Sequence, residues 1–216
     1  MRTFLSNDLE VISYGLFCVA FFIQWLTKPN TAKAIMLFYY LAASFLIFYA
    51  SNIAKANGNN NNLYNLLSFL TILGFSLYFL KIIQSRIGSF FIFLMLILNL
   101  VLYFSNIYNL KTLHTYNSSV KAFVFLSIVA YSFAYFYQVL YKIKEESIFI
   151  DFNFWFISSG LLYFFGSFFI VAFYTYIDVD NRADIWMIQN IILFISSVIS
   201  LTGSIWIRYQ SKIFGT

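Results

Sequence analysis

Seven apolar runs, each separated from the next by a short polar gap, occupy nearly all of this 216-residue chain. A helix that crosses a bilayer needs about 20 mostly apolar residues, because the hydrocarbon core is about 30 Å thick and each residue adds about 1.5 Å. The pattern therefore predicts seven transmembrane helices that form a single transmembrane domain over residues 1–216. The predicted spans are 9–27, 34–54, 63–80, 87–106, 120–141, 152–176 and 185–207.

The composition supports this prediction. Hydrophobic residues make up 62% of the chain and charged residues 10%, whereas soluble domains carry roughly 25% charged residues. With one Pro and 8 Gly, we expect largely unbroken helices. The 29 Phe and 17 Tyr suit the lipid core and the headgroup layer respectively. The sequence thus predicts an all-α, polytopic membrane protein.

The basic residues are distributed unequally between the two predicted sides of the membrane. An odd number of spans places the ends of the chain on opposite sides. Eight of the 13 basic residues fall on the side of the C-terminus, so the positive-inside rule predicts an N-terminus outside and a C-terminus in the cytoplasm. These eight are Lys28, Lys33, Lys81, Arg86, Lys142, Lys144, Arg208 and Lys212.

Several chemistries are disfavoured by the residues that the runs contain. The 13 basic and 8 acidic residues all fall at or near the ends of the runs, so we expect a bundle interior without charge, unlike that of a proton pump. One His and one Cys cannot supply a haem, zinc or Ser-His-Asp site. The run 185–207 has no lysine for a retinal Schiff base. We therefore expect no enzyme, no metal, no cofactor and no nucleic-acid partner.

Uncharged polar and aromatic side chains inside the runs are the remaining candidates for a binding site. At helical spacing they fall on one face of the sixth run and one face of the seventh. The candidate ligand-binding residues are Trp155, Ser159, Tyr163, Trp186, Asn190, Ser197 and, in the fourth run, Asn99. Two interpretations stay open: packing with hydrogen bonds between helices, or the wall of a pocket for a small or lipidic ligand. We also expect Gln138 to face the bundle, because an unsatisfied amide in lipid costs several kcal/mol.

The last quarter of the chain carries a pattern of aromatic and small residues. It consists of Phe154-Trp155, Ser158-Ser159-Gly160-Leu161-Leu162-Tyr163, Gly166, Trp186 and Gln189-Asn190. In this pattern the chain resembles an uncharacterised family of bacterial seven-helix integral membrane proteins of similar size. Gln189 stands where many members have His, and run 63–80 lacks the Glu of their third helix. The resemblance implies the bacterial inner membrane and, since members are sometimes found beside sensor-kinase genes, a signalling partner.

Two functions are compatible with these observations. The first is a non-enzymatic membrane module, receptor-like or accessory to a signalling partner, that senses a small apolar ligand or the bilayer. It would act on a cytoplasmic signalling protein through residues 28–33, 81–86 and 142–151. The alternative is a small-solute carrier or permease, which predicts a polar cavity that reaches the middle of the bilayer. We expect that cavity to be lined by Asn99, Tyr163, Asn190 and Ser197.

Overall fold

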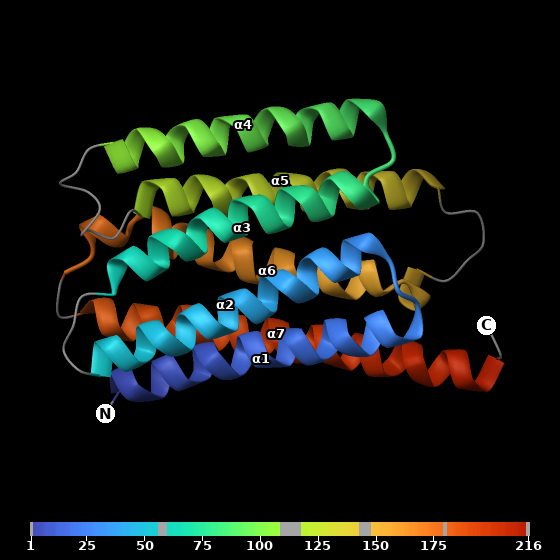
Figure 1. Ribbon diagram of the computed structural model, residues 1–216, viewed down its shortest axis with the longest axis horizontal. Coiled ribbons are helices and arrows are strands. Elements are labelled where there is room, and N and C mark those ends of the chain that lie inside the picture. The colour runs from blue at the N-terminus through green and yellow to red at the C-terminus, as the bar shows by residue number, and fades with distance from the viewer. Residues whose placement is uncertain (1, 56–59, 109–117, 143–147, 179–180, 215–216) are drawn as a thin grey trace.

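The computed structural model describes residues 2–55, 60–108, 118–142, 148–178 and 181–214, and these residues form seven α-helices and two short 3-10 turns (Figure 1). The elements are α1 (Arg2–Thr27), α2 (Thr31–Lys55), α3 (Asn61–Ile82), α4 (Arg86–Tyr108), α5 (Ser118–Lys142), η1 (Ile148–Ile150), α6 (Phe152–Ala172), η2 (Tyr174–Tyr176) and α7 (Arg182–Phe214). The predicted all-α fold with seven helices is confirmed for the described part of the chain.

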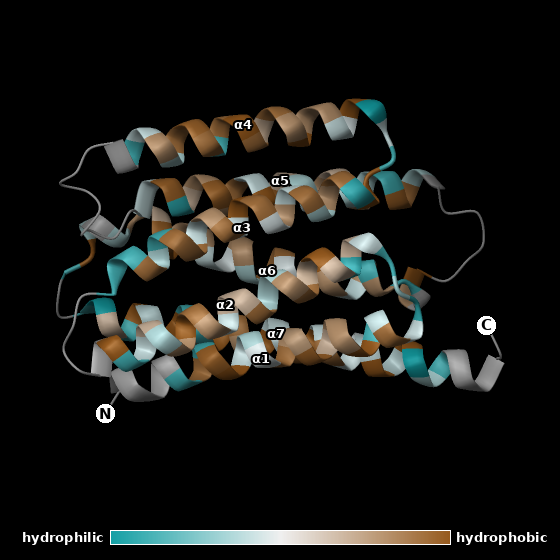
Figure 2. Ribbon diagram, viewed as in Figure 1, coloured by the Kyte–Doolittle hydropathy of each residue, from teal (hydrophilic) through white to brown (hydrophobic). Residues whose placement is uncertain are grey.

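Each helix contains a segment that is long and apolar enough to cross a membrane, as in a multi-pass membrane protein. Figure 2 shows hydrophobic residues along the helices and more hydrophilic ones near their ends. The segments are Asp8–Thr27, Thr31–Ile53, Asn61–Ile82, Arg86–Asn106, Ser118–Tyr141, Phe152–Ala172 and Arg182–Gln210. Six of them match the predicted spans to within about three residues, and the sixth segment ends four residues before its predicted span.

The sixth and seventh helices differ from their predicted spans. The span 152–176 is too long, because α6 ends at Ala172 and the tighter turn η2 follows it. The span 185–207 is too short, because α7 begins at Arg182 and continues to Phe214. The residues after 207 include Arg208, Gln210 and Lys212, which favour helix, and neither Gly nor Pro interrupts the segment before Gly215.

Successive helices run in opposite directions (Figure 1). We call the end at which α1, α3, α5 and α7 begin the N-terminal end of the bundle, and the opposite end the C-terminal end. Helix α1 packs against α2 and α7, α6 packs against α5 and α7, and α3 contacts α2, α4 and α5. Helix α4 lies at one edge of the bundle, where Ile87, Phe90 and Val101 are more than half exposed. This apolar face is suited to contact with lipid.

Side-chain caps begin three of the helices at the C-terminal end of the bundle. Asn30 Oδ1 accepts a hydrogen bond from the Lys33 N–H at 2.8 Å. Ser85 Oγ accepts one from the Gly88 N–H at 3.0 Å. Asp151 Oδ1 accepts one from the Asn153 N–H at 2.9 Å. Such caps satisfy backbone donors that the first turn leaves unpaired, so they fix where α2, α4 and α6 begin.

Aromatic rings fill the interior of the bundle from its middle toward the C-terminal end. The buried ring of Phe156 in α6 lies 4.6 Å from that of Phe21 in α1 and 5.3 Å from that of Tyr78 in α3, both edge-on. Phe17 and Phe75 approach the same ring at 6.1 Å each. Edge-on aromatic pairs contribute about 0.5–1.5 kcal/mol beyond the burial of their area. This aromatic core separates two cavities, one toward each end of the bundle.

Candidate functional site

Among the described residues, three charged side chains are buried within the bundle: Glu10 is 5% exposed, Lys33 6% and Lys121 9%. The expectation of an uncharged interior is therefore wrong. These residues do lie near the ends of apolar runs, but neighbouring helices reach as far along the bundle and cover them. A buried ion in a membrane protein is costly, so it is a candidate for function.

The oppositely charged side chains of Glu10 on α1 and Lys121 on α5 line the same cavity at the N-terminal end of the bundle, where they attract each other. Glu10 Oε2 also accepts a hydrogen bond of 3.0 Å from the hydroxyl of Tyr64 in α3. Two buried opposite charges stabilise each other, and removal of one leaves the other uncompensated. The pair and Tyr64 therefore link three helices.

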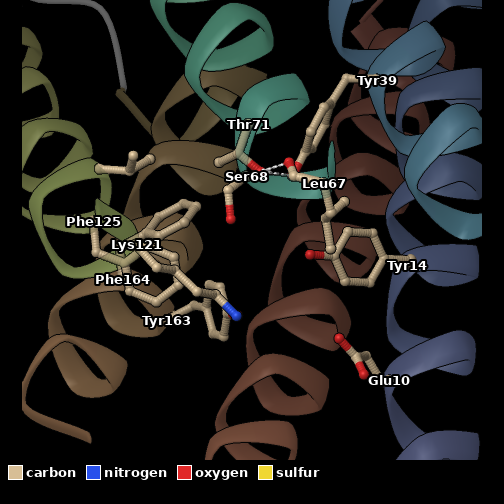
Figure 3. Close-up of a pocket in the computed structure, with 11 residues that line it drawn as sticks. Glu10, Tyr14, Tyr39, Leu67, Ser68, Thr71, Lys121, Phe125, Tyr163 and Phe164 are labelled. Carbon is tan, nitrogen blue, oxygen red and sulfur yellow. Dashed lines mark hydrogen bonds between the residues drawn. The ribbon is translucent and has the colours of Figure 1, made fainter. Parts of the chain in front are cut away.

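A cavity lies between the two charges, and we call it the charged cavity. Figure 3 shows the Glu10 carboxylate, the Lys121 ammonium and the hydroxyls of Tyr14 and Ser68 directed into it. Its volume of about 20 Å³ is enough for roughly one water molecule. Its lining residues are Glu10, Tyr14, Tyr39, Leu67, Ser68, Thr71, Lys121, Val124, Phe125, Tyr163 and Phe164.

Hydroxyl groups extend this polar region toward the middle of the bundle. Tyr39 and Thr71 share a hydrogen bond of 3.0 Å between their oxygens. Gln189 Nε2 donates to the Tyr163 hydroxyl at 3.3 Å, while Gln189 Oε1 is buried and has no hydrogen-bond partner among the described residues. Thr71 lies at the middle of α3, so the charged cavity reaches half-way along that helix.

Three aromatic rings surround the Lys121 ammonium. Its Nζ lies 5.0 Å from the ring centre of Trp186, 5.7 Å from that of Phe125 and 5.8 Å from that of Tyr64. All three distances are within the range of cation–π attraction. Phe125 belongs to the same helix as Lys121, whereas Trp186 comes from α7 and Tyr64 from α3, so two other helices surround Lys121 besides α1, which carries Glu10.

A second and larger cavity, which we call the vestibule, lies at the C-terminal end of the bundle. Its volume is about 420 Å³, within the range of small-molecule sites. The Tyr135 hydroxyl donates to Asp151 Oδ2 at 2.8 Å, and the Tyr78 hydroxyl donates to Asn153 Oδ1 at 2.8 Å. The vestibule is lined by Asn30, Thr31, Ala32, Lys81, Ile82, Gln84, Tyr135, Gln138, Val139, Asp151 and Asn153.

No protein-family model, curated protein or solved structure matches this chain. The family resemblance and the functions that it implies therefore stay predictions. Within the described ranges, no group of three or more His, Cys, Asp or Glu side chains is placed to hold a metal ion.

Two of the residues predicted from the sequence lie at the charged cavity. Tyr163 lines it, and the ring of Trp186 faces Lys121. Asn190 is buried one turn after Trp186. These positions agree with the predicted facing of the sixth and seventh helices, since α6 and α7 pack together and Gln189 bonds to Tyr163.

Trp155 lies far from this cavity, in the first turn of α6 at the C-terminal end. Its Nε1 donates to the Phe149 carbonyl at 2.9 Å. The Trp155 side chain occupies the space next to Gly203 of α7, where an added Cβ would overlap it. The position of Trp155 is that of a packing residue between α6 and α7.

The other predicted residues make contacts within or between helices. The hydroxyls of Ser159 and Ser197 donate to carbonyls of their own helices, at 2.8 Å and 2.7 Å. Asn99 Nδ2 donates to Ser127 Oγ at 2.9 Å and so links α4 to α5. Gln138 faces the bundle as expected, and its Oε1 accepts from the Gln84 N–H at 2.7 Å beside the vestibule.

Sequence reasoning missed Glu10 and Lys121 as site residues. A signal was present, because both lie inside the predicted runs 9–27 and 120–141 with apolar neighbours on either side. A charge flanked in this way faces either lipid or the bundle, and lipid is far more costly. The signal does not indicate that the two charges meet, because their helices are four elements apart in the chain.

Proposed function

We propose that this chain is a non-enzymatic, receptor-like membrane module of the bacterial inner membrane, with its N-terminus outside and its C-terminus in the cytoplasm. The observation that carries the proposal is the buried Glu10–Lys121 pair at the charged cavity. In this orientation the charged cavity lies toward the outside and the vestibule toward the cytoplasm. The two charges favour a polar ligand over the apolar ligand expected from the sequence.

The pair has the properties of a two-state switch. It joins α1, which packs against α2 and α7, to α5, which packs against α3, α4 and α6. A ligand that competes for either charge weakens this link, because the remaining partner is left buried and uncompensated. Ligand binding would thereby shift the population toward an arrangement in which α1 and α5 move relative to each other.

A continuous series of aromatic contacts connects the two ends of the bundle. Phe164 of the charged cavity lies 4.9 Å from Phe75, and Phe75 lies 6.1 Å from Phe156. Phe156 in turn contacts Tyr78, whose hydroxyl bonds to Asn153 in the vestibule. Chains of packed side chains carry coupling when they have two arrangements, so we expect a change at the charged cavity to move the vestibule.

Spin-label distance measurements test this coupling directly. Labels at Lys28→Cys and Gln84→Cys report on two exposed positions at the C-terminal end, in a Cys18→Ser background. We expect Glu10→Gln and Lys121→Met each to shift the distance distribution by about 2 Å or more, the scale of helix shifts in switching proteins.

Asp184→Asn is the matched control, because it removes an exposed charge at the same end as the charged cavity. We expect it to leave the label distances unchanged. If the Glu10 and Lys121 variants fold and give the same distances as the parent protein, the receptor-like function is contradicted.

One observation favours the alternative, a small-solute carrier. The charged cavity and the vestibule share four lining helices, α2, α3, α5 and α6, at opposite ends of the aromatic core. A carrier exposes its central site to each side in turn. Ser68→Cys, in the Cys18→Ser background, would then react with an impermeant charged thiol reagent from both sides of oriented vesicles. Reaction from the N-terminal side alone would contradict the carrier.

A further inference from the structure

The surroundings of Lys121 are unusual for an ammonium group. Lys121 lies in the first turn of α5 (Ser118–Lys142), where the helix dipole disfavours a positive charge. It is also 91% buried, given an exposed fraction of 9%. The helix dipole therefore does not explain the position of Lys121. The rings of Tyr64 and Trp186 from other helices, and the opposite charge of Glu10, favour it there.

The residues around the Lys121 ammonium are of the kinds that bind organic cations, namely aromatic rings and a carboxylate. The rings of Tyr64, Phe125 and Trp186 lie within 6 Å of the Lys121 Nζ. The Glu10 carboxylate lies on the opposite side of the charged cavity (Figure 3). Sites that recognise quaternary ammonium ligands combine an aromatic cage with a nearby negative charge in this way. We call these three rings the ammonium cage.

The tilt of the rings is compatible with a cation between them. The rings of Tyr64 and Trp186 meet edge to face, at 5.7 Å and 85°, so the two planes form a corner. Tyr64 also bonds to Glu10, which places one ring of the cage directly beside the carboxylate. The remaining space of about 20 Å³ is too small for an organic ligand, so Lys121 itself fills the site.

We propose that the ammonium cage and Glu10 form a binding site for a small alkylammonium ligand, and that Lys121 occupies this site in the unliganded protein. The ligand displaces the Lys121 side chain, takes its place between the rings and becomes the counter-charge of Glu10. A tetramethylammonium ion has as many heavy atoms as the lysine side chain beyond Cα, so the exchange conserves volume as well as charge. This proposal rests on the proposed function and names the ligand class of the same site.

Two sources supply this chemistry, namely free quaternary ammonium ions such as choline and the headgroups of phosphocholine lipids. Glu10 and Lys121 lie within four residues of the ends of the membrane segments Asp8–Thr27 and Ser118–Tyr141, near the depth of lipid headgroups. Both sources therefore have access to this level of the bundle, and the experiment distinguishes them.

The test is isothermal titration of the full-length protein with tetramethylammonium and with choline, in a detergent that lacks an ammonium group. We expect saturable binding to the parent protein. Lys121→Ala should bind at least about tenfold more tightly, because the competing ammonium is gone, and Glu10→Gln and Trp186→Leu should each bind at least about tenfold more weakly. Lys28→Ala, which removes an exposed lysine at the other end and outside the vestibule lining, should bind as the parent does.

A separate arm tests the lipid source, by titration of choline into protein in nanodiscs. If lipid headgroups fill the site, choline should give no binding heat in nanodiscs of phosphocholine lipid. It should still bind in nanodiscs of phosphatidylglycerol, which has no ammonium group.

Lys121→Met replaces Lys121→Ala if the latter does not fold. The proposal is overturned if neither ammonium ion binds to the parent protein or to the folded Lys121 variant. The label distances would then still test the receptor-like function separately.

Discussion

At Gly203 the absence of a side chain lets α6 and α7 approach closely. An added Cβ at this position would overlap the Trp155 side chain, including its ring atoms. Gly15, on α1, has the opposite surroundings, because a Cβ there would meet no atom within 4 Å. The two glycines therefore allow a controlled comparison of the same substitution. Packing requires glycine at position 203, whereas position 15 has room for a larger side chain.

We predict that Gly203→Ala lowers the free energy of unfolding by about 1–3 kcal/mol, the usual cost of overpacking. Gly15→Ala should leave stability unchanged or raise it by up to about 1 kcal/mol, because Ala favours helix over Gly. Denaturant unfolding in detergent, followed by circular dichroism, measures both. Equal stability of the two variants would show that Trp155 does not pack against Gly203.

The buried charges also make a prediction at the scale of single residues. Glu10→Gln or Lys121→Met alone should lower the free energy of unfolding by about 3 kcal/mol, since each leaves one buried charge uncompensated. The double variant should recover most of that loss, because no buried charge remains. A double-mutant cycle of unfolding free energies measures the coupling. Additive losses would mean that the two side chains do not interact.

At the scale of helices, α4 is the least buried of the seven membrane segments. It contacts α3 and α5, and much of its surface consists of exposed apolar side chains. Asn99 supplies one polar link of α4, the hydrogen bond to Ser127 of α5. Ser127 also donates to the Phe123 carbonyl of its own helix, so loss of Asn99 would not leave that hydroxyl without a partner.

We therefore predict a modest effect for Asn99→Leu, a decrease of about 1 kcal/mol in the free energy of unfolding, typical of a hydrogen bond between membrane helices. Val101→Leu on the exposed face of α4 should have no effect. Unfolding in detergent compares the two variants. A loss above about 3 kcal/mol for Asn99→Leu would mean that α4 depends on this residue for its position.

The helices are also the level at which the sequence is most informative. Length and apolarity predict all seven, because the bilayer imposes both requirements on any spanning helix. The same apolarity makes it hard to tell from the sequence which face of a helix packs in the bundle and which contacts lipid, since both environments are apolar. Tyr163 and Trp186 could be predicted at a shared face from helical spacing, whereas the meeting of Glu10 with Lys121 depends on how distant helices pack.

At the scale of the whole molecule, the vestibule lies where three connections meet. Its lining includes Asn30, Gln84 and Asp151, which belong to the three segments expected to face a signalling partner; residues 143–147 of the third lie outside the described residues. Lys28, Lys81 and Arg86 are exposed at the same end. This basic surface around a polar cavity favours an acidic segment of a partner protein.

We predict that a photo-crosslinking residue at Gln84, in native membranes, captures a cytoplasmic protein. The same residue at Phe90, which is 68% exposed on the apolar face of α4, should give no such product and serves as the control. Mass spectrometry identifies the adducts. Equal capture of proteins at both positions, or none at Gln84, would contradict a partner at the vestibule.

The length of α7 has a mechanical consequence for the whole molecule. Its 33 residues form a rod of about 50 Å, whereas about 30 Å suffices to cross the hydrocarbon core. Trp186 stands near one end of this rod, in contact with Lys121, and the other end projects beyond the bundle (Figure 1). A rod of that length acts as a lever: a tilt of about 5° displaces its tip by roughly 4 Å. If the proposed displacement of Lys121 tilted α7 by this amount, the end of α7 at the opposite surface of the membrane would move by about the width of a side chain.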